Sequence, residues 1–424
     1  MTSTQAPPHP EARPAAEAIT ACRACGNATL LPVLDLGEQA LTGTFPRTRE
    51  QKVPAVPLEL VRCAPDGCGL VQLRHTTDTG LMYGGDYGYR SGLGEFMINH
   101  LAGKVSLLTG LVDLGPDDIV LDIGSNDATL LRAYPADGPT LVGIDPTGET
   151  FREYYPDHVT LIPEYFSRAA FAGHFGERRA KVVTSIAMFY DLPRPLDFMR
   201  DVHDVLDDDG LWLMEQSYMP AMLEATAYDV VCHEHLEYYG LRQIQWMAER
   251  VGLVVVRAEL NPVYGGSLCV VLARKGTRHR IDEAGVARIL ESERALDTME
   301  PFDAFARRAV RYRDGLREFL DTSRERGLLT LGYGASTKGN VILQWCGITE
   351  RDLPCIGEVN KDKDGCFTPG TGIPIVSEAE AKSRKPDQLL VLPWIYRDGF
   401  VERERAYREG GGQLVFPLPE LSVV

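Results

Sequence analysis

The chain of 424 residues has no apolar run long enough to cross a bilayer. Its amino terminus, MTSTQAPPHPEARPAAEA, has no basic segment followed by an apolar core, so we expect no secretory signal there. The formal charge is −16, and no basic stretch interleaved with aromatic residues offsets it. Solenoid repeats are also absent from the sequence. These absences argue against membrane and nucleic-acid partners.

Cysteine is too sparse for a disulfide scaffold in a chain of this size, with nine residues in all. Four of the nine cluster near the amino terminus, as the pairs Cys22/Cys25 and Cys63/Cys68. Two thiolate pairs on turns can complete a tetrahedral zinc shell and organise a segment too small to fold on its own core. Four ligands leave no open position, which predicts a structural zinc ion. Unrelated core cysteines are the alternative.

The pattern of apolar residues in the remaining sequence is typical of an α/β protein with more than one domain. Short apolar runs such as DDIVLDIG, PTLVGIDP and AKVVTSIAMF alternate with segments of helical spacing, which is typical of βα units and a mostly parallel sheet. A second βα pattern begins at LLTLGYGASTKGN. The predicted organisation is a disordered tail (1–20), a zinc-binding module (21–75), a Rossmann-like central domain (76–275), a helical connector (276–325) and a second Rossmann-like domain (326–424).

A small-residue turn after one predicted strand and an acidic residue after the next indicate a nucleoside site. In LDIGSNDATLL, Gly124 lets the backbone pass close to a ligand at the start of a helix. About twenty residues on, Asp145 in LVGIDP can accept hydrogen bonds from two ribose hydroxyls. The first turn lacks the three-glycine fingerprint of dinucleotide sites. S-adenosylmethionine, a nucleoside without phosphates, therefore fits better than NAD.

The segment YDVVCHEHLEYYG gathers groups suited to proton transfer. Methylation of carbon needs a nucleophilic carbon, which a base generates by removing a proton beside a ketone. His235 is the candidate base, with Glu234 orienting it, and His233, Tyr238 and Tyr239 are candidate donors to the oxyanion. The histidine spacing is not that of zincin motifs. A polar helix start whose histidines merely cap is the alternative.

Taken together, these motifs resemble the C-methyltransferase family of unusual deoxysugar biosynthesis over nearly the whole chain after the tail. The matching segments are C-R-A-C with the second cysteine pair, YGGDYGYRSGLGEF, DIGSND, GIDP, YDVVCHEHLEYYG, YGGSL, GYGASTKGN, GEVNKDKDG and LPW. The resemblance implies a zinc module, a central S-adenosylmethionine domain and a carboxy-terminal nucleotide-sugar domain. It also implies a cytoplasmic enzyme that acts on a nucleotide-linked keto sugar, with dTDP as the expected nucleotide.

The resemblance assigns roles to particular residues. His235 matches the family's general base, with Glu234 beside the substrate. The residues expected to border the cofactor are Asp122, Gly124, Asn126, Asp145 and Ala187. The residues expected to contact the substrate are Tyr83, Tyr87, Tyr89, Tyr190, Gly266, Ser336, Lys338 and Asn340. Of these, Ser336, Lys338 and Asn340 open a helix and are assigned to the diphosphate or nucleoside. We expect a monomer or small homo-oligomer.

Two departures from the family pattern concern which carbon is methylated. Cys232 stands where members that act on C3 of the hexose carry a tyrosine, and SIAMFYD replaces a segment that supplies an asparagine and a histidine in those members. Both C3 and C5 therefore stay open. The rival functions are an NAD-dependent nucleotide-sugar oxidoreductase or epimerase that uses the carboxy-terminal glycine loop, and a non-catalytic zinc-module binding protein. A zinc-ribbon RNA methyltransferase is disfavoured by the negative charge.

Overall fold

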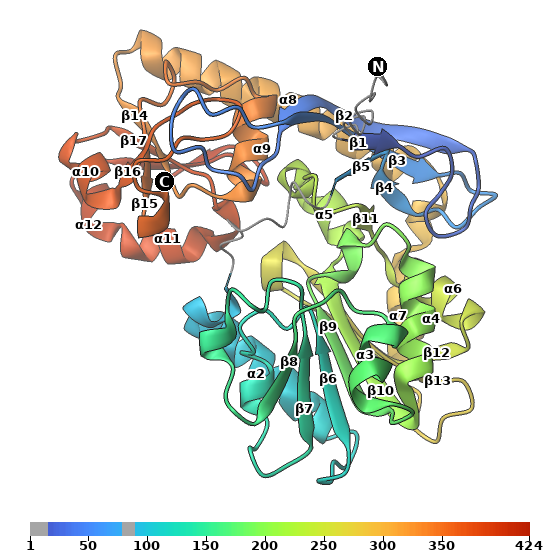
Figure 1. The fold of residues 1–424 in the computed structure, drawn as a ribbon. Helices are drawn as coiled ribbons and strands as arrows, with labels where there is room; N and C mark the ends of the chain where they lie inside the picture. Colours follow the sequence, from blue (N-terminus) through green and yellow to red (C-terminus); the bar gives the residue numbers. More distant parts are fainter. Residues whose placement is uncertain (1–15, 79–89) are drawn as a thin grey trace, which may run out of the picture.

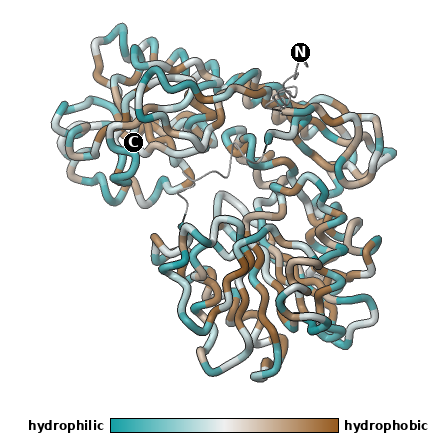
Figure 2. The backbone as a smooth tube through the Cα atoms, viewed as in Figure 1, coloured by the Kyte–Doolittle hydropathy of each residue, from teal (hydrophilic) through white to brown (hydrophobic). Residues whose placement is uncertain are grey.

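The computed structural model describes residues 16–78 and 90–424, which form an N-terminal β module, a central α/β domain and a C-terminal α/β domain (Figure 1). Within this described part, no helix is long and apolar enough to cross a membrane. The predicted substrate residues Tyr83, Tyr87 and Tyr89 lie outside the described residues. The hydropathy view places the apolar backbone segments mainly along the strands of the central sheet (Figure 2).

The N-terminal module is a small antiparallel sheet that includes a strand from far along the chain. Its order is β11 (Glu237–Tyr238), β4 (Val71–Leu73), β3 (Ala55–Cys63) and β2 (Leu30–Ala40). A separate pair joins β1 (Ala16–Ala18) to β5 (His75–Thr77). Strand β1 lies inside the range 1–20 that we predicted as a disordered tail, and its pairing with β5 is the reason why this end of the range is ordered.

The central domain is a seven-stranded sheet with one antiparallel strand. The order is β12 (Leu253–Asn261), β13 (Ser267–Arg274), β10 (Leu206–Ser217), β9 (Ala180–Ile186), β6 (Ile119–Ile123), β7 (Thr140–Ile144) and β8 (Val159–Ile162). The strands from β8 to β10 are parallel, and β13 runs against both of its neighbours. From β6 the chain adds β7 and β8 on one side, and then β9 and β10 on the other side of β6. This reversal of strand order at β6 marks the position where doubly wound sheets bind ligands.

Helices cover both faces of this sheet, because alternate strand residues point to opposite faces. Apolar residues of α2 (Glu95–Thr109) pack with one set that includes Val120 and Leu213. The opposite set, which includes Leu121 and Trp212, packs against other helices. These are α3 (Arg168–Phe175), α4 (Pro195–Val205), α6 (Leu241–Arg250) and α7 (Glu283–Ser292). The Rossmann-like central domain is thereby confirmed.

The C-terminal domain is a second doubly wound sheet. Its order is β16 (Ile375–Ser377), β15 (Ile356–Glu358), β14 (Thr330–Tyr333), β17 (Gln388–Val391), β18 (Gln413–Phe416) and β19 (Ser422–Val423), with only β19 antiparallel. Its helices are α9 (Thr337–Trp345), α10 (Glu378–Ser383), α11 (Arg397–Arg403) and α12 (Arg405–Glu409).

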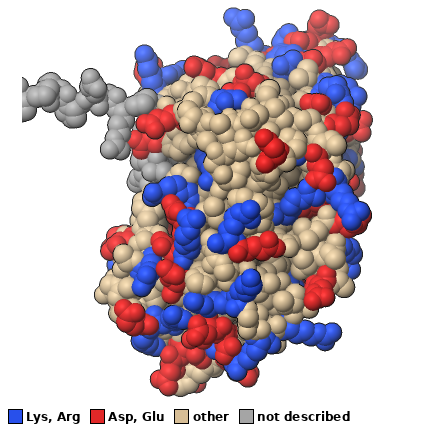
Figure 3. Space-filling view, turned by 90° about the vertical axis from the view of Figure 1, so that its right-hand side faces the viewer, with Lys and Arg blue, Asp and Glu red and all other residues tan. Residues whose placement is uncertain are grey.

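The predicted connector is helical but divides its contacts between domains. Helix α7 packs on β12 and so belongs with the central domain, whereas α8 (Glu300–Glu325) contacts both β14 and β2. Helix α5 (Met219–Ala225) lies between the N-terminal module, at the edge formed by β11, and the central sheet (Figure 1). Basic and acidic side chains are interspersed on the face that Figure 3 shows, with no large area of one sign.

Candidate active site and zinc site

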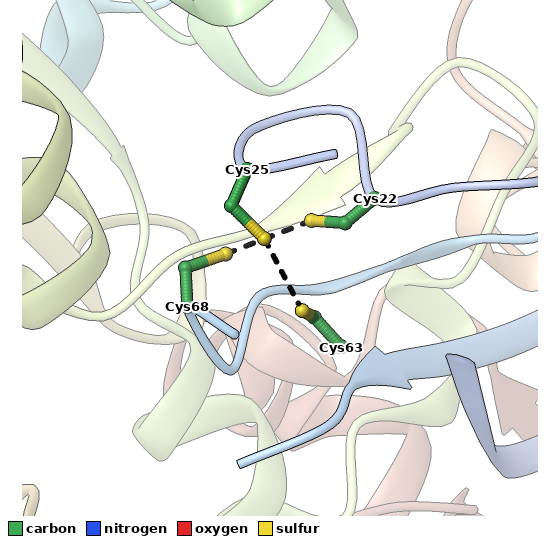
Figure 4. A group of neighbouring side chains, drawn as sticks. All are labelled: Cys22, Cys25, Cys63 and Cys68. Carbon is green, nitrogen blue, oxygen red and sulfur yellow. Dashed lines mark hydrogen bonds between the residues drawn. The ribbon is translucent and has the colours of Figure 1, made fainter. Parts of the chain in front are cut away.

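The four predicted metal ligands come together, although two turns about forty residues apart supply them. The sulfur atoms of Cys22, Cys25, Cys63 and Cys68 all lie within 4.8 Å of one another (Figure 4). The Sγ atoms of Cys22 and Cys68 are 3.6 Å apart, and those of Cys25 and Cys63 are 3.5 Å apart. A tetrahedral zinc ion with Zn–S bonds of about 2.3 Å spaces its sulfurs by about 3.8 Å. The donor set therefore fits zinc in both chemistry and spacing.

The thiols are also arranged for deprotonation of one ligand. A hydrogen bond with Cys68, opposed by burial, lowers the pKa of Cys22 to about 5. The Nε2 atom of Gln72 also donates to Cys22 Sγ at 3.2 Å. Thiolate is the form that binds zinc, and hydrogen bonds from outside the metal shell hold such ligands in place.

Strained backbone marks the carboxyl edge of the central sheet where the cofactor is expected. Gly124, at the end of β6, has a φ of +73°. Three alanine or asparagine residues beside the ends of β6 and β9 also have positive φ: Asn126, Ala128 and Ala187. Non-glycine residues adopt this conformation at a cost that proteins concentrate at binding sites. The loops after β6 and β9 meet at the switch point of the sheet, so the observation supports a ligand there.

The acidic residues at this edge are held in place by hydrogen bonds. Asp145 accepts from the backbone N of Asn126 at 2.8 Å and from Thr147, whose N and Oγ1 both lie 2.7 Å from Asp145 Oδ1. Asp122 accepts from Thr184 Oγ1 at 2.6 Å, while burial raises the pKa of its carboxyl to about 7. These carboxylates, the Gly124 turn and the Ala187 loop suit a nucleoside with an amino-acid tail.

His235 is held in one tautomer by a backbone carbonyl. Its Nδ1 lies 3.0 Å from Val230 O, and a carbonyl can only accept, so Nδ1 carries the proton. The Nε2 atom therefore keeps its lone pair, which is the state that a general base requires. The ring packs against Tyr190, with centroids 4.3 Å apart. Tyr190, which we predicted to contact the substrate, is thus a neighbour of the predicted base His235, although the two lie on separate segments.

The surroundings of His235 keep its ring neutral. Burial, reinforced by the positive charge of Lys338, lowers its pKa to about 3. Lys338 stands in the first turn of α9, and α9 contacts the short helical turn Tyr228–Val230 that supplies the Val230 carbonyl. The predicted base and the predicted diphosphate residue are therefore close enough for the charge of Lys338 to act on His235, although they come from different domains.

Glu234 lies between His235 and the N-terminal module. Burial raises the pKa of its carboxyl, and its Oε2 is a buried atom with no hydrogen-bond partner among the described residues. A Cβ on Gly43 would lie 2.9 Å from Glu234 Oε1, so any larger residue at position 43 would displace this carboxyl. The thiol of Cys232 is buried beside it, and burial raises the pKa of that thiol. Cys232 is therefore held as a neutral thiol in this position.

Two residues predicted as oxyanion donors have other partners. His233 is buried, and its Nε2 donates to Val56 O of β3 at 3.1 Å. Tyr238 is also buried, and its hydroxyl donates to Val230 O at 3.3 Å, the same carbonyl that orients His235. Both side chains bind backbone in the folded chain. These hydrogen bonds support the base-bearing segment, and the roles of His233 and Tyr238 as oxyanion donors stay predictions.

Three further predicted substrate residues are engaged in packing or capping. Ser336 Oγ accepts from Gly339 N at 3.0 Å and so caps α9, while Asn340 is buried and donates to Thr42 O at 2.8 Å. Gly266 has a φ of +124°, and a Cβ there would approach Ala221 Cβ to 2.6 Å. Asn340 thus joins the C-terminal domain to the N-terminal module.

The glycine loop of the C-terminal domain is accounted for by close packing. A Cβ on Gly332 would meet Ile356 at 2.6 Å, and one on Gly334 would meet Pro393 at 2.6 Å. A Cβ on Gly339 would meet Leu392 at 2.8 Å. These glycines let α9 and the strands approach one another, so they do not by themselves point to a second dinucleotide site.

A buried contact beside the base joins two residues that the sequence did not predict to meet. Asp229 Oδ2 accepts from Trp394 Nε1 at 2.8 Å, and its Oδ1 has no hydrogen-bond partner among the described residues. Burial raises the pKa of Asp229, and the charge of Lys338 opposes that rise. Both residues lie in motifs that we recognised, YDVVCHEH and LPW. The motifs alone do not show that an aspartate in one meets a tryptophan in the other.

Comparison with known protein families covers almost the whole chain. Residues 22–83 match a zinc binding domain, residues 94–258 a methyltransferase domain, and residues 262–419 a C-methyltransferase C-terminal domain. The C-methyltransferase NovU of Streptomyces niveus is 30% identical over 416 residues, which cover 96% of this chain and 97% of NovU.

Solved structures resemble only part of the chain. YcgJ from Bacillus subtilis aligns with 42% of this chain and 99% of its own, with 12% identity and a TM-score of 0.34. LepI bound to SAM aligns with 38% of this chain and 43% of its own, with 16% identity and a TM-score of 0.32.

Proposed function

The chain belongs to the C-methyltransferase family, and on that premise we propose that it methylates a ring carbon beside the ketone of a nucleotide-linked 4-keto deoxysugar. It is an S-adenosylmethionine-dependent methyltransferase with a zinc-binding module. The observation that carries the proposal is the tautomer of His235, because Val230 O leaves Nε2 free to accept a proton. A neutral imidazole of this kind suits removal of a proton from carbon.

In the proposed reaction, His235 Nε2 takes the proton from the carbon next to the ketone. The electron pair of the C–H bond becomes the enolate, whose charge rests on the former keto oxygen. When bound, S-adenosylmethionine supplies an electrophilic methyl carbon on a sulfonium. The enolate carbon forms the new C–C bond to that methyl while the C–S bond breaks, and its electron pair stays on sulfur. The balanced products are a methylated sugar, S-adenosylhomocysteine and the proton on His235.

Lys338 is suited to two parts of this reaction. Its positive charge acts on His235, so an anionic substrate bound beside it would offset that charge and raise the pKa of the base. A lysine in the first turn of a helix also suits a phosphate. These features favour a nucleoside diphosphate sugar, and we retain dTDP as the expected nucleotide, with Tyr190 packed beside the base.

The methylated position is C3 or C5, since both flank a C4 ketone. The small Cys232 and the Tyr190 segment distinguish this chain from the pattern expected for C3, and we propose C5 as the first position to examine. A zinc site of four thiolates requires reduced cysteines, which supports a cytoplasmic location and a role in deoxysugar assembly.

The test is incubation of the purified protein with S-adenosylmethionine and a dTDP-4-keto-6-deoxyhexose, followed by mass spectrometry. We expect a gain of one methylene unit, which His235→Gln abolishes and the exposed control His174→Gln retains. In D2O with S-adenosylhomocysteine, the wild type should exchange the acidic proton of the sugar and His235→Gln should not. Full exchange and methylation by His235→Gln would refute the assignment of the base. A product spectrum with a quaternary C3 would refute methylation at C5.

A further inference from the structure

An arginine between two zinc ligands reaches the strand that follows the base. Arg23 lies between Cys22 and Cys25, and its guanidinium is buried, with 3% of the side chain exposed. It donates to Leu73 O at 2.5 Å and to Thr76 Oγ1 at 2.7 Å. Its backbone N donates to Gln72 Oε1 at 3.1 Å. The zinc knuckle is therefore tied through Arg23 to β4 and the residues after it.

The same guanidinium faces a buried carboxylate on β11. Arg23 Nε lies 3.8 Å from Oε1 of Glu237, whose side chain is 0% exposed. Glu237 stands opposite Gln72 in the antiparallel pairing of β11 with β4. Neither carboxylate oxygen has a hydrogen-bond partner among the described residues. Burial raises the pKa of Glu237, and the positive charge of Arg23 opposes that rise, so Arg23 is the cation that favours the charged carboxylate. Gln72 links the pair to Cys22.

This pair sits two residues beyond His235 in the chain. A buried carboxylate left without its cation is strongly unfavourable, so the pair constrains where β11 can lie. Strand β11 begins two residues after His235 and carries Tyr238, which shares the Val230 carbonyl with the base. A shift of β11 would therefore move the imidazole relative to its carbonyl. Displacements of about 1 Å at reacting groups cost about a hundredfold in rate.

We propose that Arg23 and Glu237 are positioning residues through which the zinc knuckle sets the place of the base His235. The zinc module then acts in catalysis as a platform, because β11, which begins two residues after His235, is one strand of its sheet. The inference rests on the proposed role of His235 and adds to it a second function for the zinc site. Both side chains are almost fully buried, so the inference gives them no direct contact with the substrate or the cofactor.

The experiment compares Arg23→Gln, Glu237→Gln, the double variant and the conservative Arg23→Lys in the full chain. The matched control is Arg74→Gln, because Arg74 forms a more exposed pair with Glu59 at 2.8 Å in the same module. For each protein, zinc content, affinity for S-adenosylhomocysteine, kcat and KM for the keto sugar, and sugar proton exchange in D2O are measured.

We expect both single Gln variants to bind S-adenosylhomocysteine normally and to keep the KM for the sugar. Their kcat and exchange rate should fall by about 10- to 100-fold, as for other residues that orient a functional group from outside. The double variant removes both charges and should recover part of the loss, as should Arg23→Lys. If Arg23→Gln does not fold, Glu237→Gln carries the test, because it is nearly isosteric.

Unchanged kcat in zinc-loaded Glu237→Gln would overturn the inference. So would a loss of zinc and thermal stability with kcat per folded molecule unaffected, which is the result of a purely structural role. Failure of the proposed function looks different, because the wild type itself would then neither methylate nor exchange any keto sugar.

Discussion

Acid should destabilise this protein through two histidines of the base-bearing segment, the buried His233 and the partly buried His235. Burial lowers the pKa of His235 to about 3 and that of His233 to about 4, from 6.5 for each in the unfolded chain. The unfolded state therefore binds more protons below pH 6.5, so stability falls as the pH drops through 6.5 toward these values. Above that pH both rings are neutral in both states and contribute nothing.

The size of the effect follows from the shifts. At about pH 5, each histidine costs about 2 kcal/mol of folding free energy, because the unfolded chain is protonated there and the folded chain is not. Replacing either by glutamine, which does not titrate, should remove about that amount of the pH dependence. The double variant should remove about twice as much.

The assay is urea unfolding followed by tryptophan fluorescence at about pH 8 and about pH 5. The quantity compared is the loss of unfolding free energy between the two pH values, so any destabilisation common to both cancels. His174→Gln, which removes an exposed imidazole, is the control. If His235→Gln and His233→Gln lose as much stability on acidification as the control, the reasoning from burial is wrong.

Three further predictions concern metal, backbone and domain contact. Purified protein should contain one zinc ion per chain by emission spectrometry, and Cys25→Ser should lose zinc and unfold the N-terminal module, because the ion organises it. Gly266→Ala should lower the unfolding free energy by about 2 kcal/mol or more through its positive φ and its clash with Ala221; an unchanged melting temperature would contradict this. Trp394→Phe should cost about 1–3 kcal/mol because it leaves Asp229 without its donor, and Asp229→Asn in the same background should restore part of that loss in denaturant unfolding.

Part of the site could be predicted from local sequence because its residues directly follow strands or lie on short turns. Gly124 and Asp145 follow successive strands, and parallel strands bring their carboxyl ends to one edge. The cysteine pairs lie on turns, so their spacing predicted the tetrathiolate, which the structure confirms. His235 was a candidate base from its own segment and was supported by the resemblance, whereas the assignment of Lys338 came from the resemblance; both roles stay predictions.

Other assignments could not be made from local pattern. Tyr238 and His233 stand beside the base in sequence, which suggested that they act on the substrate. Their hydrogen bonds to Val230 and Val56 depend on side-chain directions set by the sheet that they join. Asn340 lies in the first turn of α9, which suggested a phosphate site, and its Nδ2 donates to Thr42 O of the N-terminal module. No local pattern shows this contact, and the role of Asn340 toward the substrate stays a prediction.

The sequence by itself determined the α/β class, the order of the domains and the zinc ligands, because periodicity, turn residues and cysteine spacing are local properties. The tertiary structure alone decided that β11 pairs with β4, that Arg23 meets Glu237 and that Trp394 meets Asp229. These contacts join residues far apart in the chain. They depend on which strand edge is unpaired in the folded chain and on which buried charged group needs a partner. Local sequence patterns predict neither.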